Sequence, residues 1–146
     1  MPMVAVTIYH NVEGRFEPYQ EGQPLLLVLS YRLACGAELG PQGVAEDAFQ
    51  FFNADLEFLE PRRGGDDREV LFLAACVYRL LGCRSLSVGD VIHVRNDTDG
   101  PDGTADVWLA CDRNEWRPIA EPFSRSGPRG TAAAVYERLT ALRASA

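Results

Sequence analysis

A polar step from Arg84 to Asp90 (RSLSVGD) separates a long apolar segment, which stops at Gly82, from an alternating apolar run. Gly89 can adopt a positive φ, and the side chains of Ser87 and Asp90 can bond to nearby backbone groups. Such residues are typical of a tight turn. We therefore predict that the chain passes here from a helix into a strand. Any fold proposed for the chain must contain a helix that is followed by a strand at this position.

Runs of β-branched and other apolar residues predict the strands. Residues 4–9 alternate in character, as in a strand with one buried face. Residues 25–33 form a nearly continuous apolar run, typical of a strand buried on both faces. The expected strands cover residues 4–9, 25–33, 91–95, 107–111 and, more briefly, 116–119, and an acidic hairpin loop over 96–103 joins the third to the fourth.

A helical period predicts a first helix over residues 44–59. Its apolar stripe is expected to pack in the core, and its polar side chains should face solvent. Acidic residues in the first turn favour the positive end of the helix dipole. The stripe consists of Phe49, Phe52, Leu56 and Leu59, and the opposite side of Glu46, Gln50, Asn53, Glu57 and Glu60.

Two further helices are expected. The second covers residues 66–81, with Asp66 and Glu69 as a capping box, and we predict that it is central because it is apolar nearly all round. The last begins at Thr131, and its apolar residues Val135, Leu139 and Leu142 share one face.

The strands come in adjacent pairs and do not alternate with helices. This order favours an α+β fold with a mainly antiparallel sheet, two central helices and a C-terminal helix. The 146 residues suit a single globular domain over 1–146. Residues 44–119 form the core that carries the turn motif, and residues 120–146 form a C-terminal loop and helix.

The net charge of −7 is uneven, since residues 1–73 hold five arginines against twelve acids. An acidic chain disfavours non-specific binding to nucleic acid, because phosphate contacts need a cationic face. No apolar run approaches the roughly 18 residues that a membrane span needs. The N-terminus lacks the pattern of a secretory signal. We therefore expect a cytoplasmic protein that binds neither nucleic acid nor membrane.

No metal site or cofactor is predicted. The acidic loop has three aspartates near two glycines, but strands flank it and Trp108 stands where a calcium loop needs a bidentate glutamate. No glycine loop of the phosphate-binding kind is present. The cysteines form no C-x-x-C pair, and we interpret them as reduced structural thiols at positions 35, 76, 83 and 111.

A catalytic triad can be drawn from Ser85 or Ser87 with His93 and Asp90, but its geometry is poor. Asp90 and His93 are three residues apart in an extended segment, so their side chains should point to opposite faces of the strand. No oxyanion signature accompanies them. We therefore predict that the protein is not an enzyme and assign no catalytic residue.

The two tryptophans suggest a binding patch. On the strand over 107–111, Val107, Leu109 and Cys111 share a face, which leaves Trp108 on the other. If the first face is core, Trp108 can join Arg95 or Arg117 in a surface patch. Alternatively, Trp108 packs under the C-terminal helix.

The residues Arg84–Ile92 (RSLSVGDVI), followed by Trp108–Asp112 (WLACD) and Trp116, resemble the YodL-like domains and small uncharacterised proteins of actinobacterial plasmids and integrated elements. Ala48-Phe49 and Phe52-Asn53 fit the same pattern, so that the resemblance covers residues 44–119. It implies an association with mobile-element proteins and an adaptor or regulatory role, and it supplies no catalytic residue.

Our leading interpretation is a non-enzymatic protein-interaction or regulatory module of a plasmid or integrated element, with an unidentified protein partner. Arg84 would be its anchor, because a guanidinium can offer two parallel donors to a carboxylate or phosphate. A homo-oligomer stays open. The candidate binding residues are Arg84, Ser85, Ser87, Asp90, Trp108, Trp116 and Arg117.

Three alternatives stay open. The acidic first half suggests a DNA mimic that inhibits a host DNA-processing enzyme. A small hydrolase would use a serine or cysteine nucleophile. Direct binding of nucleic acid would require the arginines of the C-terminal segment, Arg125, Arg129, Arg138 and Arg143.

Overall fold

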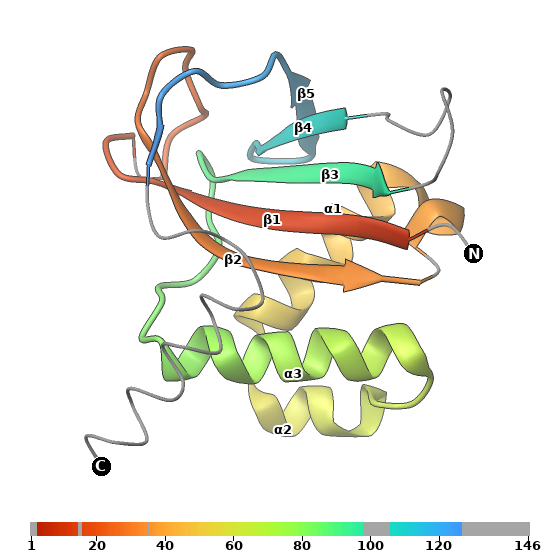
Figure 1. Cartoon of the computed structure of the whole chain (residues 1–146). Helices are drawn as coiled ribbons and strands as arrows, with labels where there is room; N and C mark the ends of the chain where they lie inside the picture. The colour runs from red at the N-terminus through yellow and green to blue at the C-terminus, as the bar shows by residue number, and fades with distance from the viewer. Residues whose placement is uncertain (1–2, 15, 35, 98–105, 127–146) are drawn as a thin grey trace.

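The structure, a computed structural model, describes residues 3–14, 16–34, 36–97 and 106–126, with the backbone alone at residues 3, 36–39, 66 and 97. Six strands form one sheet in the order β5-β4-β3-β1-β2-β6 (Figure 1). Every neighbouring pair is antiparallel except β2 and β6, which are parallel. The strands are β1 (Met3–Asn11), β2 (Leu25–Leu33), β3 (Val91–Asp97), β4 (Asp106–Cys111), β5 (Trp116–Ile119) and β6 (Arg125–Ser126).

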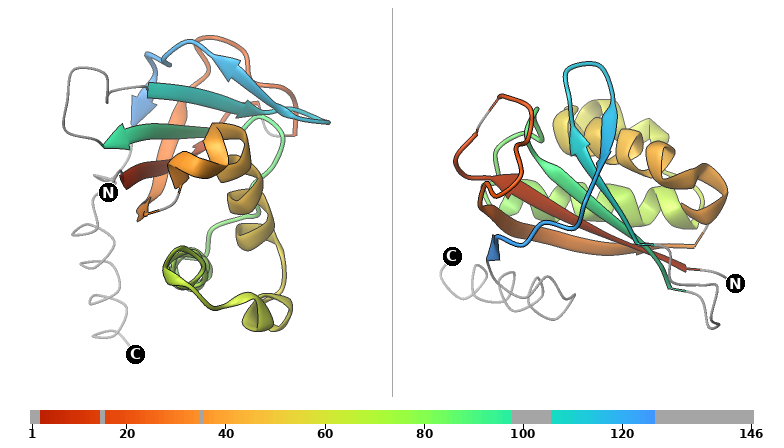
Figure 2. Two further views of the ribbon diagram at one scale, coloured as in Figure 1. Left: turned by 90° about the vertical axis from the view of Figure 1, so that its right-hand side faces the viewer. Right: turned by 90° about the horizontal axis from the view of Figure 1, so that it is seen from above.

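The helices lie together on one face of this sheet (Figure 2). They are α1 (Gly36–Asn53), α2 (Leu56–Leu59), the 3-10 turn η1 (Glu60–Arg62) and α3 (Asp66–Leu80). α1 contacts β1, β3, β4 and β5, whereas α3 packs against β2 and against α1. The predicted α+β class with a mainly antiparallel sheet is therefore confirmed.

Both faces of the sheet bury apolar side chains. The main core lies between the sheet and the helices and includes Ile8, Leu29 and Ile92, none more than 2% exposed. A second cluster on the opposite face gathers Tyr9, Tyr19, Leu25, Val91, Trp108 and Ala110. Tyr19 comes from the loop between β1 and β2, so this loop helps to cover the second face.

The predicted helix over 44–59 is in fact two elements. α1 begins earlier, with a kink at Gly40 (φ 76°, ψ 164°), and ends at Asn53, and α2 follows after a break. The buried face of α1 centres on Ala48, Phe51 and Phe52, and Phe49 lies beside it, so the expected stripe does not form one face. Phe49, predicted to be core, is 40% exposed, whereas the neighbouring Phe51 is fully buried.

The second predicted helix is present as α3, but two of its expected features are wrong. Gly65 occupies the N-cap position without a side-chain cap, and Glu69 pairs with Arg63 and does not close a capping box. The helix is also not central, since Leu73 is 54% and Leu80 61% exposed. The sheet covers one side of α3 and α1 and α2 cover another, which leaves a third side outside both.

Two sequence predictions lie outside the described residues, namely most of the acidic loop over 96–103 and the C-terminal helix from Thr131. Within the described ranges, none of the helices has the length and apolar character that a membrane span requires.

Candidate functional site

Arg84 and Asp90 form an ion pair inside the predicted turn. Both terminal nitrogens of Arg84 donate to the carboxylate oxygens of Asp90, at 2.7 Å each. The same nitrogens also donate to the backbone carbonyls of Ser85 (3.0 Å) and Asn11 (3.1 Å). Bonding to the Asp90 carboxylate raises the pKa of Arg84. The guanidinium N–H groups that would bind another protein are therefore already hydrogen-bonded within the chain.

Asp90 is fully buried and joins the turn to the end of β1. Besides the two bonds from Arg84, its carboxylate accepts the backbone N–H groups of Asn11 (2.9 Å) and Ser87 (2.8 Å). A buried carboxylate needs such donors, because an unpaired charge is costly to remove from water. Asp90 thus fixes the turn to the end of β1.

The serines of the motif are hydrogen-bonded to each other within the turn. The hydroxyl of Ser87 donates to the carbonyl of Ser85 (3.1 Å). His93 and Asp90 do not meet, since the Asp90 oxygens are bonded to Arg84 and to backbone, and His93 stacks on Trp108 with ring centroids 4.0 Å apart. This arrangement does not assemble the drawn triad.

Asn53, at the end of α1, forms two hydrogen bonds with the backbone of the turn. Its amide nitrogen donates to the carbonyl of Leu86 (2.8 Å) and its amide oxygen accepts the N–H of Leu86 (2.7 Å). Leu86 is 1% exposed and belongs to the main core. The motif therefore joins α1, β1 and β3 around a buried leucine.

Trp108 and Trp116 lie on opposite faces of the sheet, so the predicted single face that holds both is wrong. Trp108, on β4, belongs to the second cluster, while Trp116, on β5, belongs to the main core. The register explains this, since Trp116 pairs with Cys111 and successive residues of a strand alternate between faces. Trp108 is only 5% exposed.

Arg117 lies on the same face of the sheet as Trp108, since it pairs with Ala110, two residues along β4 from Trp108. Its guanidinium donates to the carbonyl of Tyr19 (2.8 Å) and lies 3.5 Å from the carboxylate of Asp112. It therefore holds the loop between β1 and β2 against β5.

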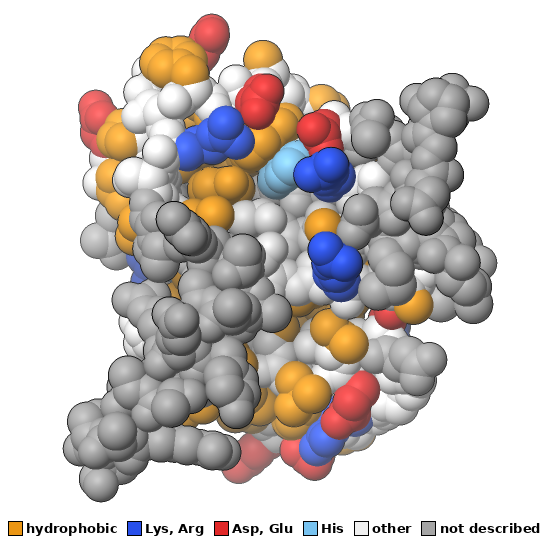
Figure 3. Space-filling model, viewed as in Figure 1, with side chains coloured by type: hydrophobic (Ala, Val, Ile, Leu, Met, Phe, Trp, Pro, Cys, Tyr) orange, Lys and Arg blue, Asp and Glu red, His pale blue; other side chains and the backbone are white. Residues whose placement is uncertain are grey.

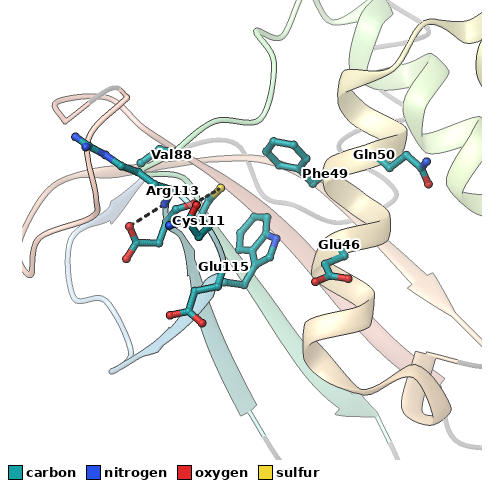
Figure 4. A pocket seen from close by; sticks show the side chains of 10 residues that line it. Glu46, Phe49, Gln50, Val88, Cys111, Arg113 and Glu115 are labelled. Carbon is teal, nitrogen blue, oxygen red and sulfur yellow. Dashed lines mark hydrogen bonds between the residues drawn. The ribbon is translucent and has the colours of Figure 1, made fainter.

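A cavity of about 290 Å³ opens between α1 and the turn that joins β4 to β5 (Figure 4). Phe49 and Trp116 stand edge to face in its wall, with ring centroids 6.4 Å apart. Val88 of the turn motif and Cys111 complete the apolar part. The carboxylates of Glu46, from α1, and Glu115, from the turn, lie at its rim.

The charged residues at the rim are mainly acidic. Among the described residues, neither Glu46 nor Glu115 has an ion-pair partner. Asp112 also lines the cavity and is paired with Arg117. The side chain of Arg113, the one basic residue of the lining, points away from the cavity (Figure 4). The arrangement offers an aromatic wall beneath two carboxylates, which suits a cation.

Cys111 does not have the properties of a nucleophile. Burial, and then the nearby Asp90 carboxylate, raise the pKa of its thiol to about 12. Because the thiolate is the reactive form, Cys111 stays a protonated thiol at neutral pH. Its role in the cavity is that of an apolar surface.

The second face holds a histidine beside charged groups (Figure 3). His93 Nε2 lies 3.3 Å from a carboxylate oxygen of Asp106, without the alignment of a hydrogen bond. Burial lowers the pKa of His93 more than this carboxylate raises it. A neutral imidazole stacked on Trp108 therefore belongs to the packing of this face.

Sequence reasoning found Trp116 but missed Phe49, Glu46 and Glu115 as members of one site. The signal was present in part, since Phe49 was placed in an aromatic stripe and Glu46 on the opposite side of the same helix. The sequence could not show that the β4–β5 turn packs near α1, because only the tertiary fold brings these two segments together.

Comparison of the chain with protein-family models, with curated proteins and with solved structures found no match, so its resemblance to the YodL-like domains stays a prediction.

Proposed function

We propose that the protein is an interaction module that binds a cationic side chain, arginine or lysine, of a protein partner in the cavity between α1 and the β4–β5 turn. The observation that carries this proposal is the pairing of a half-exposed aromatic side chain, Phe49, with two rim carboxylates that lack an ion-pair partner among the described residues.

The apolar wall supports the proposal through size and chemistry. An arginine or lysine side chain has an apolar stem that packs on aromatic rings and a charged end that remains near water. A cation over an aromatic ring gains about 0.5–1 kcal/mol at an exposed site and more when it is desolvated. Phe49 and Trp116 offer such rings at right angles. The cavity volume of about 290 Å³ accommodates a single side chain better than a larger ligand.

The rim supplies the charge. Glu46 and Glu115 project from different elements at the rim, so that both carboxylates add negative charge near an entering guanidinium. Bonds from an arginine to carboxylates are the stronger kind of hydrogen bond and add geometric selectivity. The proposal therefore expects arginine to bind more tightly than lysine, and an uncharged side chain of similar length to bind weakly.

A peptide panel tests this function. Acetylated, amidated pentapeptides with a central arginine, lysine, norleucine or glutamate are titrated into the full chain, and the indole signals of the tryptophans are followed by NMR. We expect the arginine and lysine peptides to shift the signals of Trp116 and not those of Trp108, which lies on the opposite face of the sheet. The norleucine and glutamate peptides should leave both unchanged.

A matched variant separates charge from shape. The double change Glu46→Gln and Glu115→Gln keeps the size of both side chains and removes their charge, and it should abolish the shift with arginine. Glu57→Gln and Glu60→Gln together, on α2 and η1, serve as the control and should leave it intact. Equal responses to arginine and norleucine peptides would contradict the proposal.

A further inference from the structure

The cavity between α1 and the β4–β5 turn has a corner made by two aromatic rings. The ring planes of Phe49 and Trp116 stand at 79° to each other, with centroids 6.4 Å apart. Phe49 is 40% exposed and Trp116 only 6%, so one ring borders the solvent and the other lies deeper. A cation is attracted to the negative face of an aromatic ring. Two such rings therefore favour a cationic group that packs closely on both.

The backbone carbonyls around this corner already accept hydrogen bonds. Four of them belong to residues that line the cavity, and each accepts an N–H group from elsewhere in the chain. They are the carbonyls of Val88 (from Phe16, 3.1 Å), Cys111 (from Gly89, 2.9 Å), Glu115 (from Asp112, 2.8 Å) and Trp116 (from the side chain of Gln42, 2.8 Å). A donor that enters the cavity has to compete with these bonds, so the wall favours a group that needs no acceptor.

Two further side chains make the wall apolar. Val88 is a hydrocarbon, and Cys111 is a buried, protonated thiol whose Sγ lies 3.8 Å from the carbonyl oxygen of Asp112. A thiol of this kind behaves as a small hydrophobic group. The carboxylates of Glu46 and Glu115 lie at the rim (Figure 4). The cavity thus combines negative charge at its mouth with an apolar interior.

This combination distinguishes between two kinds of lysine side chain. An unmodified ammonium carries three N–H donors, and a donor that is removed from water without an acceptor is unfavourable. Such a group is held best at the rim, beside the carboxylates. A quaternary ammonium keeps the positive charge but has no N–H donor, and its methyl groups can pack on aromatic rings.

We propose that the cavity takes a quaternary ammonium group, as carried by a trimethylated lysine side chain of the partner. The proposal rests on the proposed function, because it concerns the same cavity, and it names the form of the cation that fits best. Phe49 and Trp116 contact the methyl groups, while Glu46 and Glu115 supply the opposite charge. Trimethylation of the lysine therefore strengthens binding.

Three peptides of one sequence test this preference. Acetylated, amidated pentapeptides carry a central lysine, a central trimethyllysine, or the uncharged analogue in which a tert-butyl group replaces the trimethylammonium group. Each is titrated into the full chain, and its dissociation constant is read from the indole signal of Trp116. We expect the trimethyllysine peptide to bind at least about fivefold more tightly than either of the other two.

A ring variant links the preference to the aromatic corner. Phe49→Leu keeps an apolar side chain at a half-exposed position and removes the ring. It should bring the affinity for the trimethyllysine peptide to within about twofold of that for the lysine peptide. Phe58→Leu, at an aromatic residue of α2 that is 46% exposed, is the matched control and should keep the preference. An unchanged preference in folded Phe49→Leu would overturn the proposal.

The peptides also separate this inference from the function on which it rests. If the lysine peptide binds and the trimethyllysine peptide binds no more tightly, the preference is wrong and the cation site stands. If none of the charged peptides binds, the arginine peptide included, both proposals fail. Equal affinity for trimethyllysine and its uncharged analogue would show an apolar cavity that does not select charge. Choline that binds more tightly than the trimethyllysine peptide would overturn the side-chain assignment and indicate a free small molecule.

Discussion

Arg84→Ala would leave the Asp90 carboxylate buried without its guanidinium partner. Asp90 is fully buried, and the Arg84 side chain is 24% exposed. Loss of one member of such a pair costs about 3–5 kcal/mol, because the other charge stays in a poorly solvated place. We therefore expect Arg84→Ala to lower the free energy of unfolding by about 3 kcal/mol in urea titrations at pH 7.

A double-mutant cycle separates this loss from a general packing defect. Arg84→Ala combined with Asp90→Asn removes both charges and should cost less than the sum of the two single changes. Additive costs would argue that the ion pair does not stabilise the turn. In that case Arg84 would again be available as the partner anchor that its place in the motif first suggested.

His93 gives the stability a specific dependence on pH. Its pKa is lowered in the folded protein, chiefly by burial, below the ordinary value of 6.5. Below pH 6.5 the unfolded chain therefore binds a proton that the folded chain does not, so stability falls as the pH falls through this range. His93→Gln should lose less stability than the unmodified protein between pH 7 and pH 5, as measured by urea unfolding. Equal losses would assign the dependence to other groups.

At the residue scale, the sequence could predict which side chains share a strand face but not what each face meets. Alternation correctly separated Trp108 from Leu109 and Cys111. It could not show that both faces of the sheet are buried, because the loop that covers Trp108 is polar and has no periodic pattern. The sequence likewise could not show that Arg84 forms an ion pair with Asp90, although Asp90 is only six residues away in the same motif.

At the scale of the turn between α3 and β3, Gly89 is a position where a side chain would be poorly tolerated. Its φ is 98°, and an added Cβ would lie 2.5 Å from the carbonyl oxygen of Glu17 and 2.7 Å from that of Gly14. Because both are backbone atoms, a side chain there would have to displace the loop between β1 and β2. We expect Gly89→Ala to lower the free energy of unfolding by about 3 kcal/mol.

Gly82 offers a matched control for this change. Its φ is also positive, at 70°, but a Cβ there would meet no atom within 4 Å. Gly82→Ala should therefore cost only the backbone strain, about 1 kcal/mol, by the same urea titration. Equal costs at the two positions would show that the close approach to the loop does not matter.

A helix boundary was predicted well where a glycine marks the end of the helix. It was predicted less well where tertiary packing determines the last residue. Gly82 follows the end of α3 closely, as expected of a residue that tolerates a positive φ. The break after Asn53 has no glycine or proline, so the apolar period alone suggested one continuous helix. The amide of Asn53, bonded to Leu86 across the fold, stabilises the position of that end.

At the scale of the whole molecule, the order of the elements was sufficient to predict the α+β class. Adjacent strand pairs led to a mainly antiparallel sheet, as observed. The short parallel strand β6 was not predicted, because two residues carry no pattern. The cavity was not predicted either, since its wall and rim come from α1, β4, β5 and the turn motif, which only the complete fold assembles.

The function proposed here separates two roles that the sequence placed together. The Arg84–Asp90 pair stabilises the turn, and Val88 of the same turn contributes to the cavity wall. Variants should therefore affect stability and binding independently. Glu46→Gln with Glu115→Gln changes only the rim, whereas Arg84→Lys keeps the charge of the internal pair but loses its two parallel donors.

The most direct measurement is the dissociation constant of the arginine pentapeptide, determined together with the melting temperature for these two variants. We predict that the double glutamine variant binds at least about tenfold more weakly with an unchanged melting temperature, since about 1.4 kcal/mol of charge interaction is lost. Arg84→Lys should melt several degrees lower and, at a temperature where it is folded, bind as the unmodified protein does. Weakened binding in folded Arg84→Lys, with full binding in the double glutamine variant, would contradict this account and return the site to Arg84.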